Sequence, residues 1–232
     1  MPPASSFRIT IIIPTWNEAE NILSALAALE PMRKAGHEVI VVDGGSADAT
    51  VSLSRSLADR VITADLGRSA QMNAGAAAAN GDVLLFLHAD TRLPAAADRL
   101  ISQGLLATGA GWGRFDVRLS GRHPLLRVIE YMMNWRSRLS GIATGDQALF
   151  VRRDWFEAAG GFPALPLMED IALSRALKRR GAPLCLRERV ITSSRRWERH
   201  GILRTVLLMW RLRLAYALGV NPQRLARRYY RS

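Results

Sequence analysis

Short apolar runs alternate with helix-forming stretches over the first 90 residues, and this alternation limits the folds open to the chain. The runs are rich in Ile, Val and Leu: RITIIIP (8–14), HEVIVVD (37–43), RVITA (60–64) and DVLLFLH (82–88). Helices are predicted between them over residues 18–32, 48–57 and 68–80. Buried parallel strands joined by helices have this pattern. The sequence therefore predicts an α/β fold, a mostly parallel sheet with helices on both faces.

The rhythm changes after Pro94. The sequence predicts a helix over 95–107, an extended stretch over 109–121 and a long helix over 124–141, followed by the segment 147–162, QALFVRRDWFEAAGGF. No internal repeat and no linker rich in Pro, Ser or Gly interrupts the chain. With 232 residues, 49% of them hydrophobic, one sizeable core can form. We expect one compact domain over 1–200 and a basic, amphipathic helical tail over 201–232.

Positive charge is concentrated in the last quarter of the chain. The formal net charge is +12, and from Ile171 onward there are 16 Arg and Lys residues against 2 acids. The single cysteine, Cys185, excludes an intramolecular disulfide and a thiolate metal cluster, and it fits a reducing compartment. The first residues lack the pattern of a cleavable signal peptide, so the expected location is cytoplasmic.

The tail mixes apolar and basic residues. GILRTVLLMWRLRLAYALGV (201–220) is too interrupted by arginines for an ordinary membrane-spanning helix. It suits a helix lying at an anionic membrane surface, which would place the protein on the inner face of the plasma membrane. The alternative is an amphipathic helix packed on the domain with its arginines in solvent. Basic charge without a recognisable nucleic-acid-binding motif predicts no nucleic-acid partner.

Polar residues follow the first two predicted strands, at the sheet edge where open α/β folds bind ligands. After the first strand, Asn17 can cap a helix and Glu18 suits the helix's positive N-terminus. After the second, Asp43 precedes two glycines, and Asp48 can cap the next helix. Capping alone would explain these residues. No G-x-G-x-x-G fingerprint of dinucleotide binding follows the first strand.

Four segments in order resemble the family-2 inverting glycosyltransferases of the GT-A fold. They are TIIIPTWNEAENI, VVDGGSADATV, GRSAQMNAGAAAANGDVLLFLHADT and MEDIALSRALKRRG. The resemblance runs from about Arg8 to Trp197 and is greatest to the bacterial branch labelled arsenosugar-biosynthesis-like glycosyltransferases. It implies a GT-A fold and transfer of a hexosyl or related group from a nucleoside-diphosphate sugar.

The resemblance implies a nucleotide pocket lined by Pro14, Glu18, Asp43 and Asp48, with Asp43 near the base. It also places Arg68 near the nucleotide or its phosphates. An arginine at the start of a helix is unfavourable for the helix dipole, which favours a ligand-facing role.

The family's acidic metal motif falls on His88-Ala89-Asp90. The resemblance implies that Asp90 binds a divalent cation, Mg²⁺ or Mn²⁺, bridging the donor diphosphate. Such an ion would offset the charge that the leaving nucleoside diphosphate gains. His88 stands where the family has an acid facing the ribose. It could face the ribose, join the metal shell and favour Mn²⁺ or a later transition metal, or be an interior hydrogen-bonding group.

Glu169 and Asp170 begin a predicted helix, where adjacent acids are commonly caps. The resemblance implies that this pair supplies the general base, which removes the acceptor hydroxyl's proton as its oxygen attacks the anomeric carbon. Asp170 is the first choice for the base and Glu169 the second.

The remaining polar residues concern the acceptor. Asp146 and Gln147 precede a predicted strand, and the resemblance implies that Asp146 positions the acceptor or the surroundings of the base. Arg196 and Trp197 lie in a basic, aromatic segment that would approach the diphosphate or the acceptor, although a solvated loop has the same composition. A lipid-linked acceptor and a small nucleoside-like molecule both fit. The sequence identifies neither the sugar nor the base.

Two other functional classes remain open from the sequence. A sugar nucleotidyltransferase would show a glycine-rich, basic loop after the first strand, whereas PTWNEAEN is acidic. A catalytically silent nucleotide-binding or membrane-scaffolding protein would tolerate loss of Asp90 or Asp170, and both are present. The glycosyltransferase hypothesis leads.

Overall fold

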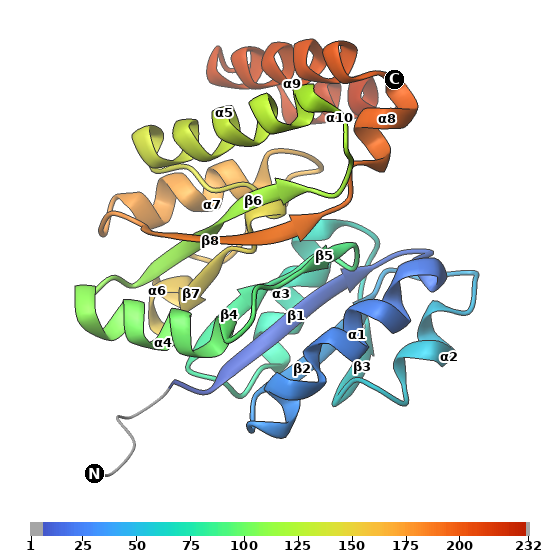
Figure 1. Cartoon of the computed structure of the whole chain (residues 1–232), viewed down its shortest axis with the longest axis vertical. Helices are drawn as coiled ribbons and strands as arrows, with labels where there is room; N and C mark the ends of the chain where they lie inside the picture. The colour runs from blue at the N-terminus through green and yellow to red at the C-terminus, as the bar shows by residue number, and fades with distance from the viewer. Residues whose placement is uncertain (1–6, 231–232) are drawn as a thin grey trace.

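A computed structural model describes residues 7–230, with the side chain of Tyr230 excepted. Its strands form one mixed sheet in the order β3-β2-β1-β4-β7-β6-β8-β5 (Figure 1). The strands are β1 (Ile9–Thr15), β2 (Glu38–Asp43), β3 (Arg60–Thr63), β4 (Val83–Phe86), β5 (Thr91–Arg92), β6 (Trp112–Leu119), β7 (Phe150–Arg152) and β8 (Leu184–Thr192). The predicted α/β class and the first four strands are confirmed.

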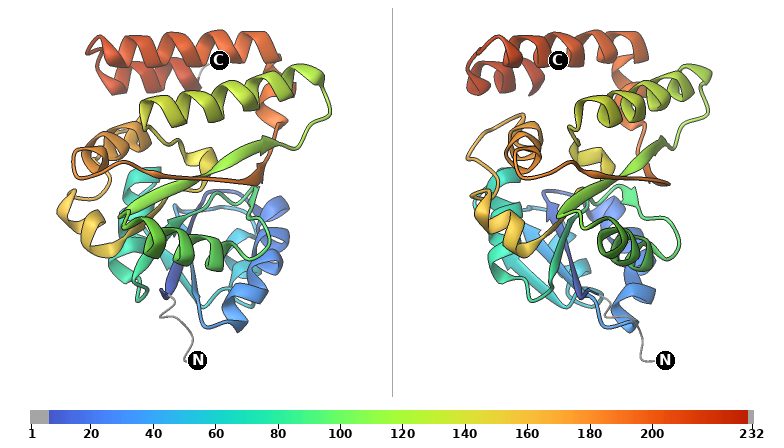
Figure 2. Two further views of the ribbon diagram at one scale, coloured as in Figure 1. Left: turned by 60° about the vertical axis from the view of Figure 1, so that its left-hand side comes forward. Right: turned by 90° about the vertical axis from the view of Figure 1, so that its left-hand side faces the viewer.

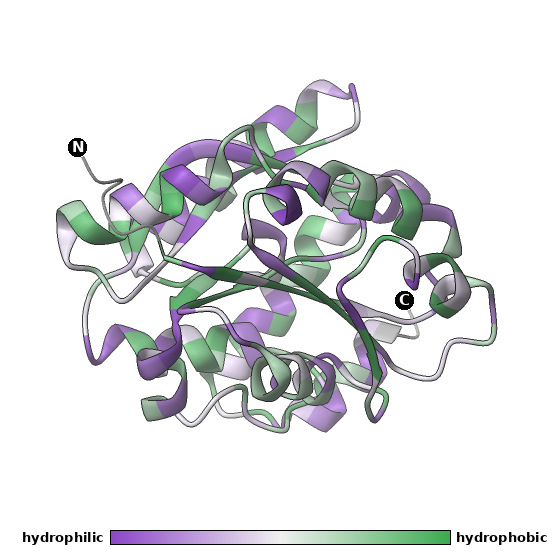
Figure 3. Cartoon of the chain, turned by 90° about the horizontal axis from the view of Figure 1, so that it is seen from below, coloured by the Kyte–Doolittle hydropathy of each residue, from purple (hydrophilic) through white to green (hydrophobic). Residues whose placement is uncertain are grey.

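The first half of the sheet is parallel. β1 pairs with β2 and β4, and β2 pairs with β3, all in the same direction. Because β1 and β2 are enclosed on both faces, Ile11, Ile12 and Ile13 have no exposed surface, and every residue of β2 is buried. The strands are correspondingly hydrophobic along their length, whereas the helices alternate hydrophobic and hydrophilic residues (Figure 3). The carboxyl ends of these strands lie at one edge of the sheet.

The second half of the sheet is mixed. β7 runs antiparallel to both β4 and β6, whereas β8 runs parallel to β6 and antiparallel to the short β5. The sequence did not predict β8, because Arg187, Glu188 and Arg189 interrupt its apolar pattern. These three residues are exposed, and the strand has a register irregularity opposite Phe115 and Asp116. The bulge allows charged residues to sit within an otherwise paired strand.

Helices cover both faces of the sheet. The helices are α1 (Ala19–Lys34), α2 (Thr50–Ser54), α3 (Arg68–Ala78), α4 (Ala97–Thr108), α5 (Pro124–Ser140), α6 (Arg153–Ala158), α7 (Glu169–Lys178), α8 (Arg195–His200), α9 (Ile202–Ala217) and α10 (Pro222–Tyr230). One face packs on α1 and α4, through residues such as Leu26 and Ile101. The other packs on α3, α6 and α7, through residues such as Met72, Phe156 and Leu173.

The predicted tail is folded against the domain. Leu212 of α9 and Leu225 and Ala226 of α10 form a buried cluster with Leu167, Met168 and Ile171, next to the start of α7. In two further views, α9 and α10 lie together beyond α5 (Figure 2). Packing on the domain, one of the two alternatives for the tail, therefore holds for one face of α9. Among the described residues, no helix is long and apolar enough to cross a membrane.

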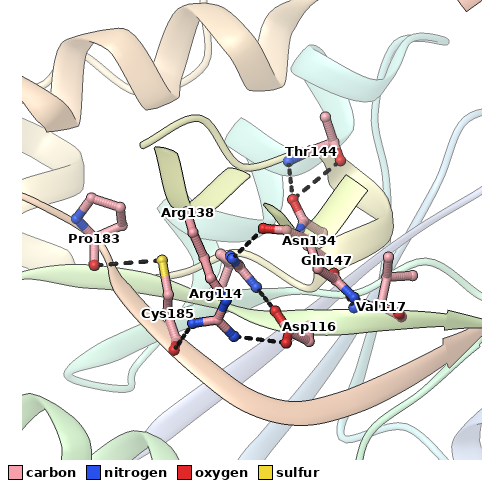
Figure 4. Close-up of polar contacts among 9 residues, drawn as sticks. All are labelled: Arg114, Asp116, Val117, Asn134, Arg138, Thr144, Gln147, Pro183 and Cys185. Atoms are coloured by element: carbon pink, nitrogen blue, oxygen red, sulfur yellow. Dashed lines mark hydrogen bonds and ion pairs between the residues drawn. The ribbon is translucent and has the colours of Figure 1, made fainter. Parts of the chain in front are cut away.

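A buried polar network joins α5 to β6 and β8 (Figure 4). Arg114 of β6 has no exposed surface and forms an ion pair with Asp116. Arg138 of α5 donates to Asp116 Oδ2 at 2.7 Å and to the carbonyl of Cys185 at 3.2 Å. Asn134 of α5 pairs with both backbone groups of Val117, at 2.8 and 3.0 Å. These contacts fix the position of α5 over the sheet.

Candidate active site

The loops after β1 and β2 are joined by polar side chains. Asp48 accepts hydrogen bonds from the backbone N–H of Thr50 at 3.0 Å and of Ala19 at 3.1 Å, so one carboxylate caps the starts of both α2 and α1. The expected capping by Asn17 is wrong. Asn17 has a positive φ of 53°, and its side chain accepts from the N–H of Ala47, which links the two loops.

The predicted nucleotide residues gather at these loops. Asp43 is buried, and its Oδ2 accepts from the N–H groups of Gly45 and Ser46 at 2.9 and 2.8 Å. Pro14 is half-buried at the end of the adjacent strand, one residue before Thr15, the sheet partner of Asp43. Burial raises the pKa of Glu18, and the nearby Asp90 adds to this increase. The two acids are thus close enough to interact.

A cavity of about 1030 Å³ opens at the carboxyl end of β4 and is lined largely by α5, α7 and α9. Eight of the residues singled out from the sequence line it: Arg68, His88, Asp90, Asp146, Glu169, Asp170, Arg196 and Trp197. Pro14, Glu18, Asp43, Asp48 and Gln147 do not line it. The structure therefore brings the proposed general base, the proposed metal ligand and the basic residues together at one cavity. Four residues predicted for the nucleotide pocket and one predicted for the acceptor lie outside its lining.

The proposed base is held at the junction of α7 and the short 3₁₀ turn η1 (Gly145–Gln147). Asp170 Oδ2 accepts from the backbone N–H of Gly145 at 3.0 Å, and Oδ1 accepts from the N–H of Ile171 at 2.7 Å. Gln147 has no exposed surface, and its Oε1 accepts from the N–H of Thr144 at 3.2 Å. Gln147 thus closes the turn, and contact between its side chain and an acceptor would require the turn to open.

His88 lies against this turn. Its side chain is 16% exposed, and its Nδ1 is 3.8 Å from Asp146 Oδ1, too far for a hydrogen bond. Burial, reinforced by the positive charge of Arg68, lowers the pKa of His88 from 6.5 to about 4. At neutral pH the imidazole is therefore uncharged. His88 also lines the cavity, and its ring has no hydrogen bond within residues 7–230, so the interior hydrogen-bonding interpretation gains no support. Contact with the ribose or with a metal stays a prediction.

Replacing Gly145 by Ala should disturb the packing of His88. A Cβ at Gly145 would lie 2.7 Å from His88 Nε2, closer than such atoms approach. We expect Gly145→Ala to lower the free energy of unfolding by about 1–3 kcal/mol through overpacking. The additional change His88→Ala should recover at least half of that loss. Urea denaturation of both single variants and the double variant measures the coupling, and strictly additive losses would contradict the contact.

Glu169 is the most perturbed acid of the site. It is 5% exposed, and burial, with a smaller contribution from the charge of Asp170, raises its pKa from 4.5 to about 7. A carboxyl group with this pKa is partly protonated at neutral pH. Asp170 is the more accessible of the two, which favours it for contact with an acceptor.

The raised pKa of Glu169 predicts a pH-dependent cost to stability. Below about pH 4.5 the group is protonated in both the folded and the unfolded chain, so it has little effect. As pH rises toward 7 the unfolded chain loses this proton first, which favours unfolding. Glu169→Gln removes the titration and should gain stability relative to wild type by up to about 3 kcal/mol above pH 7, at about 1.4 kcal/mol per pKa unit. Urea denaturation from pH 4.5 to 8 tests this, and a constant difference would refute it.

The residues of the cavity could hold a divalent cation only if substrate phosphates complete its coordination. Within residues 7–230 no group of three or more His, Cys, Asp and Glu side chains could hold a metal ion. Mg²⁺ in nucleotide sites, however, is commonly held by one or two carboxylates together with substrate phosphates and water. Asp90, which lines the cavity, supplies such a carboxylate. The site is suited to a metal-diphosphate complex rather than to a metal held by protein alone.

The far wall of the cavity contains residues that the sequence did not single out. Arg136 of α5 and Arg213 of α9 line it, together with apolar side chains of the same helices. Burial, followed by the charge of Arg213, lowers the pKa of Arg136 to about 10, and burial also lowers the pKa of Arg213. Asp170 and Asp146 act in the opposite direction on both. The sequence signal that could have identified these two residues is an arginine among the apolar residues of each predicted helix.

Arg196 and Trp197 lie at the entrance to the tail. The Arg196 guanidinium stacks 3.7 Å from the centroid of the Tyr229 ring and donates to the Tyr229 carbonyl at 3.2 Å. Trp197 packs with Leu119, Leu126 and Ile129. The alternative of a solvated loop is wrong, because this segment is the helix α8 and both side chains are half-buried. Both residues line the cavity, and contact with the diphosphate or the acceptor stays a prediction.

Comparison with known proteins identifies related sequences. A model of "Glycosyl transferase family 2" matches residues 10–155, which include Asp90 and Asp146 but not Glu169 and Asp170. The chain is 28% identical over 236 residues to "Probable glycosyltransferase YdaM" of Bacillus subtilis, covering 91% of this chain and 55% of that protein. It is 28% identical over 167 residues to "Dolichol-phosphate mannosyltransferase" of Pyrococcus furiosus, covering 68% of this chain and 46% of that one. The chain thus spans about half the length of these relatives.

A solved structure has the same fold. The mannosyltransferase PcManGT of Pyrobaculum calidifontis, in complex with GDP-Man and Mn²⁺, superimposes with a TM-score of 0.62 at 23% identity. The alignment covers 82% of this chain and 57% of that one. The likeness confirms the architecture described above, including its mixed, mainly parallel sheet.

Proposed function

The chain belongs to glycosyl transferase family 2, and from this premise we propose that it is an inverting enzyme that uses a nucleoside-diphosphate sugar. The observation that carries the proposal is the shared cavity, in which Asp170 and Asp90 are both exposed to the same space. An inverting transfer requires a base on one side of the anomeric carbon and charge stabilisation on the other. The two alternatives, a sugar nucleotidyltransferase and a catalytically silent scaffold, gain no support from this arrangement of Asp170 and Asp90.

In the proposed reaction Asp170 acts as the general base. Its carboxylate, fixed by the N–H of Gly145, accepts the acceptor's proton while the acceptor oxygen attacks the anomeric carbon. Arg68, at the start of α3, contributes positive charge on the diphosphate side, with Arg196 at the tail end of the same cavity. Asp90 would hold Mg²⁺ or Mn²⁺, which supplies charge stabilisation for the departing diphosphate.

The donor site would extend from the cavity to the β1 and β2 loops. Asp43 and Asp48 would then contribute by holding these loops in shape, since their oxygens are already engaged by backbone N–H groups. Glu18, near Asp90, and Pro14 would border the ribose side. GDP-Man in the similar mannosyltransferase supports a nucleotide-sugar donor.

The acceptor is proposed to carry a hydroxyl and to be either lipid-linked or a small nucleoside-like molecule. The second choice corresponds to the arsenosugar-biosynthesis-like branch, whose label remains a proposal for this chain. Asp146, at the edge of the cavity, would position the acceptor. The basic tail supports contact with the inner face of the plasma membrane.

A panel of nucleoside-diphosphate sugars, incubated with and without Mn²⁺, tests the proposed reaction. We expect slow hydrolysis of one donor that falls at least about tenfold when the metal is chelated, because the leaving diphosphate loses its counter-charge. Asp90→Asn should abolish the metal dependence, whereas Asp154→Asn, in an exposed ion pair with Arg152, should behave as wild type. Metal-independent hydrolysis would reject Asp90 as the ligand, and the absence of binding to any donor would reject the proposed function.

A further inference from the structure

Two rows of exposed apolar side chains lie on α5 and α9. On α9 and its C-cap residue Leu218 they recur every three or four residues, on one side of the helix: Leu203, Leu207, Trp210, Leu214 and Leu218, each more than 60% exposed. On α5 the equivalent row contains Val128, Tyr131, Met132, Trp135 and Leu139, between 43 and 71% exposed. We call these two rows the apolar face. Monomeric proteins rarely leave so much contiguous apolar surface in water without a use for it.

The apolar face is continuous with the active-site cavity. Trp135 and Leu139 of α5, and Trp210 and Leu214 of α9, belong to the exposed rows and also line the cavity. Met132 does the same, and the half-buried Met133 and Met209 continue the apolar wall of the cavity. An apolar path therefore leads from exposed surface to Asp170. A purely polar acceptor would gain nothing from this path.

Cations surround the apolar face. Arg204 and Arg211 are exposed on α9 beside the row, at helical positions adjacent to Leu207. Exposed arginines continue on α10 at positions 224, 227 and 228, and from residue 195 to 230 the only acid is Glu198. A combination of exposed Trp, Tyr and Leu with surrounding arginines complements an anionic lipid surface.

Two further cations lie inside the cavity. Arg136 and Arg213 line the same cavity as Asp170 and Asp146, whose charges act on both guanidinium groups. The Arg136 Nη2 atom is buried without a hydrogen-bond partner in the described chain. A buried guanidinium donor normally has a partner. Arginine's planar group is suited to phosphate oxygens, which it can contact through two parallel hydrogen bonds.

Building on the proposed function, we infer that the acceptor is a membrane lipid with a phosphate in its head group. Its apolar chain lies between α5 and α9, its phosphate contacts Arg136 and Arg213, and its head reaches Asp170 from the bilayer on which the apolar face docks. This assigns an acceptor path and a phosphate subsite, and it makes α5, as well as the tail, part of the membrane contact.

Two kinds of lipid could supply the phosphate, and the bonds made and broken at the anomeric carbon are the same for both. An oxygen of the lipid head forms a bond to the anomeric carbon as the bond between that carbon and the diphosphate oxygen breaks, and the nucleoside diphosphate leaves. A hydroxyl, as in phosphatidylglycerol, gives its proton to Asp170. A prenyl monophosphate attacks through an oxygen that is already deprotonated, so with this lipid Asp170 would not act as a base and Asp170→Asn would lose little transfer.

The test supplies a labelled donor and the full chain with three kinds of vesicle. These contain phosphatidylcholine alone, phosphatidylcholine with phosphatidylglycerol, or phosphatidylcholine with a long-chain prenyl monophosphate. We expect label in the organic phase with one of the two anionic lipids and none with phosphatidylcholine alone, because its phosphate is a diester and its choline has no hydroxyl to receive the sugar. The lipid that becomes labelled identifies the source. A water-soluble hydroxyl acceptor labelled while all three lipids remain unlabelled would overturn the inference.

Two variants test the path and the subsite separately. Leu207→Asp, on the apolar face but outside the cavity, should reduce cosedimentation with phosphatidylglycerol vesicles by at least about tenfold, and Leu106→Asp, 49% exposed on α4, should not. Arg136→Met should raise the lipid concentration for half-maximal transfer by about 100-fold, and Arg136→Lys by about tenfold. Circular dichroism confirms that each variant is folded.

The outcomes distinguish the inference from the proposed function. Donor hydrolysis without lipid measures the proposed function alone, because it requires neither the bilayer nor a lipid acceptor. Failure of the wild-type chain to sediment with either anionic vesicle overturns the inference even if donor hydrolysis is normal. Equal lipid dependence of wild type and Arg136→Met overturns the phosphate subsite.

Discussion

Asp170→Asn should reduce sugar transfer by about 10³-fold or more, which is within the range expected for loss of a general base. The amide is close in size to the carboxylate and can still accept the hydrogen bond from the Gly145 N–H, so the turn should keep its shape. It cannot take the acceptor's proton at neutral pH. Because the group acts in the transition state, the dissociation constant of the donor should change by less than about threefold. Single-turnover transfer and calorimetric donor binding measure the two effects.

Glu169→Gln is the matched control for this variant. Glu169 is the neighbouring acid, but it is almost fully buried, so its loss should reduce transfer less than the loss of Asp170. If Glu169→Gln reduces transfer more than Asp170→Asn does, Glu169 rather than Asp170 is the general base. Near-normal turnover of Asp170→Asn would exclude it as the base.

Asp116→Asn should lower the free energy of unfolding by about 3–5 kcal/mol, the usual cost of removing one partner from a buried ion pair. Arg114 has no exposed surface and would lose its counter-ion, while its Nε already has no hydrogen-bond partner within the described chain. Arg138 would lose its anionic partner as well. Equilibrium urea denaturation at pH 7 measures the loss.

The exposed pair of Arg152 and Asp154 provides the comparison for Asp116→Asn. Its side chains are 41 and 59% exposed, so Asp154→Asn should change stability by no more than about 0.5 kcal/mol. Similar losses in the two variants would mean that solvent reaches Arg114 and that the network does not fix α5.

The first half of the fold could be predicted from the sequence because its strands are enclosed on both faces. In β1, β2 and β4, burial requires nearly continuous Ile, Val and Leu, so the strands stand out from the helices between them. β8 gives no such pattern, since Arg187, Glu188 and Arg189 lie at a bulge where the side chains reach solvent. Its pairing with β6 depends on contacts distant in sequence.

Some residues of the candidate site could likewise be predicted from the sequence, and others could not. Asp90 and Asp170 lie at a strand end and a helix start, positions that local sequence can indicate. Arg136 and Arg213 lie within helices, and only the packing of α5 and α9 around the cavity makes them neighbours of Asp170. The sequence around each of these arginines is typical of any amphipathic helix and does not by itself indicate a binding site. The tail was similarly ambiguous because α9 has one packed face and one exposed face.

The antiparallel pairing of β4 with β7 has a consequence for how such an enzyme can diversify. The loops after β1, β2 and β4 come from the parallel half, whereas α5, α7 and α9 follow or flank the second half. Between the neighbouring strands β4 and β7, the two halves pair through three residue pairs, Val83 with Arg152 to Leu85 with Phe150. Under the proposed function, the loops of the first half form most of the donor side and the helices of the second half form most of the acceptor side. Changes in α5 and α9 should then alter the acceptor more than the donor, so the acceptor could evolve faster than the donor.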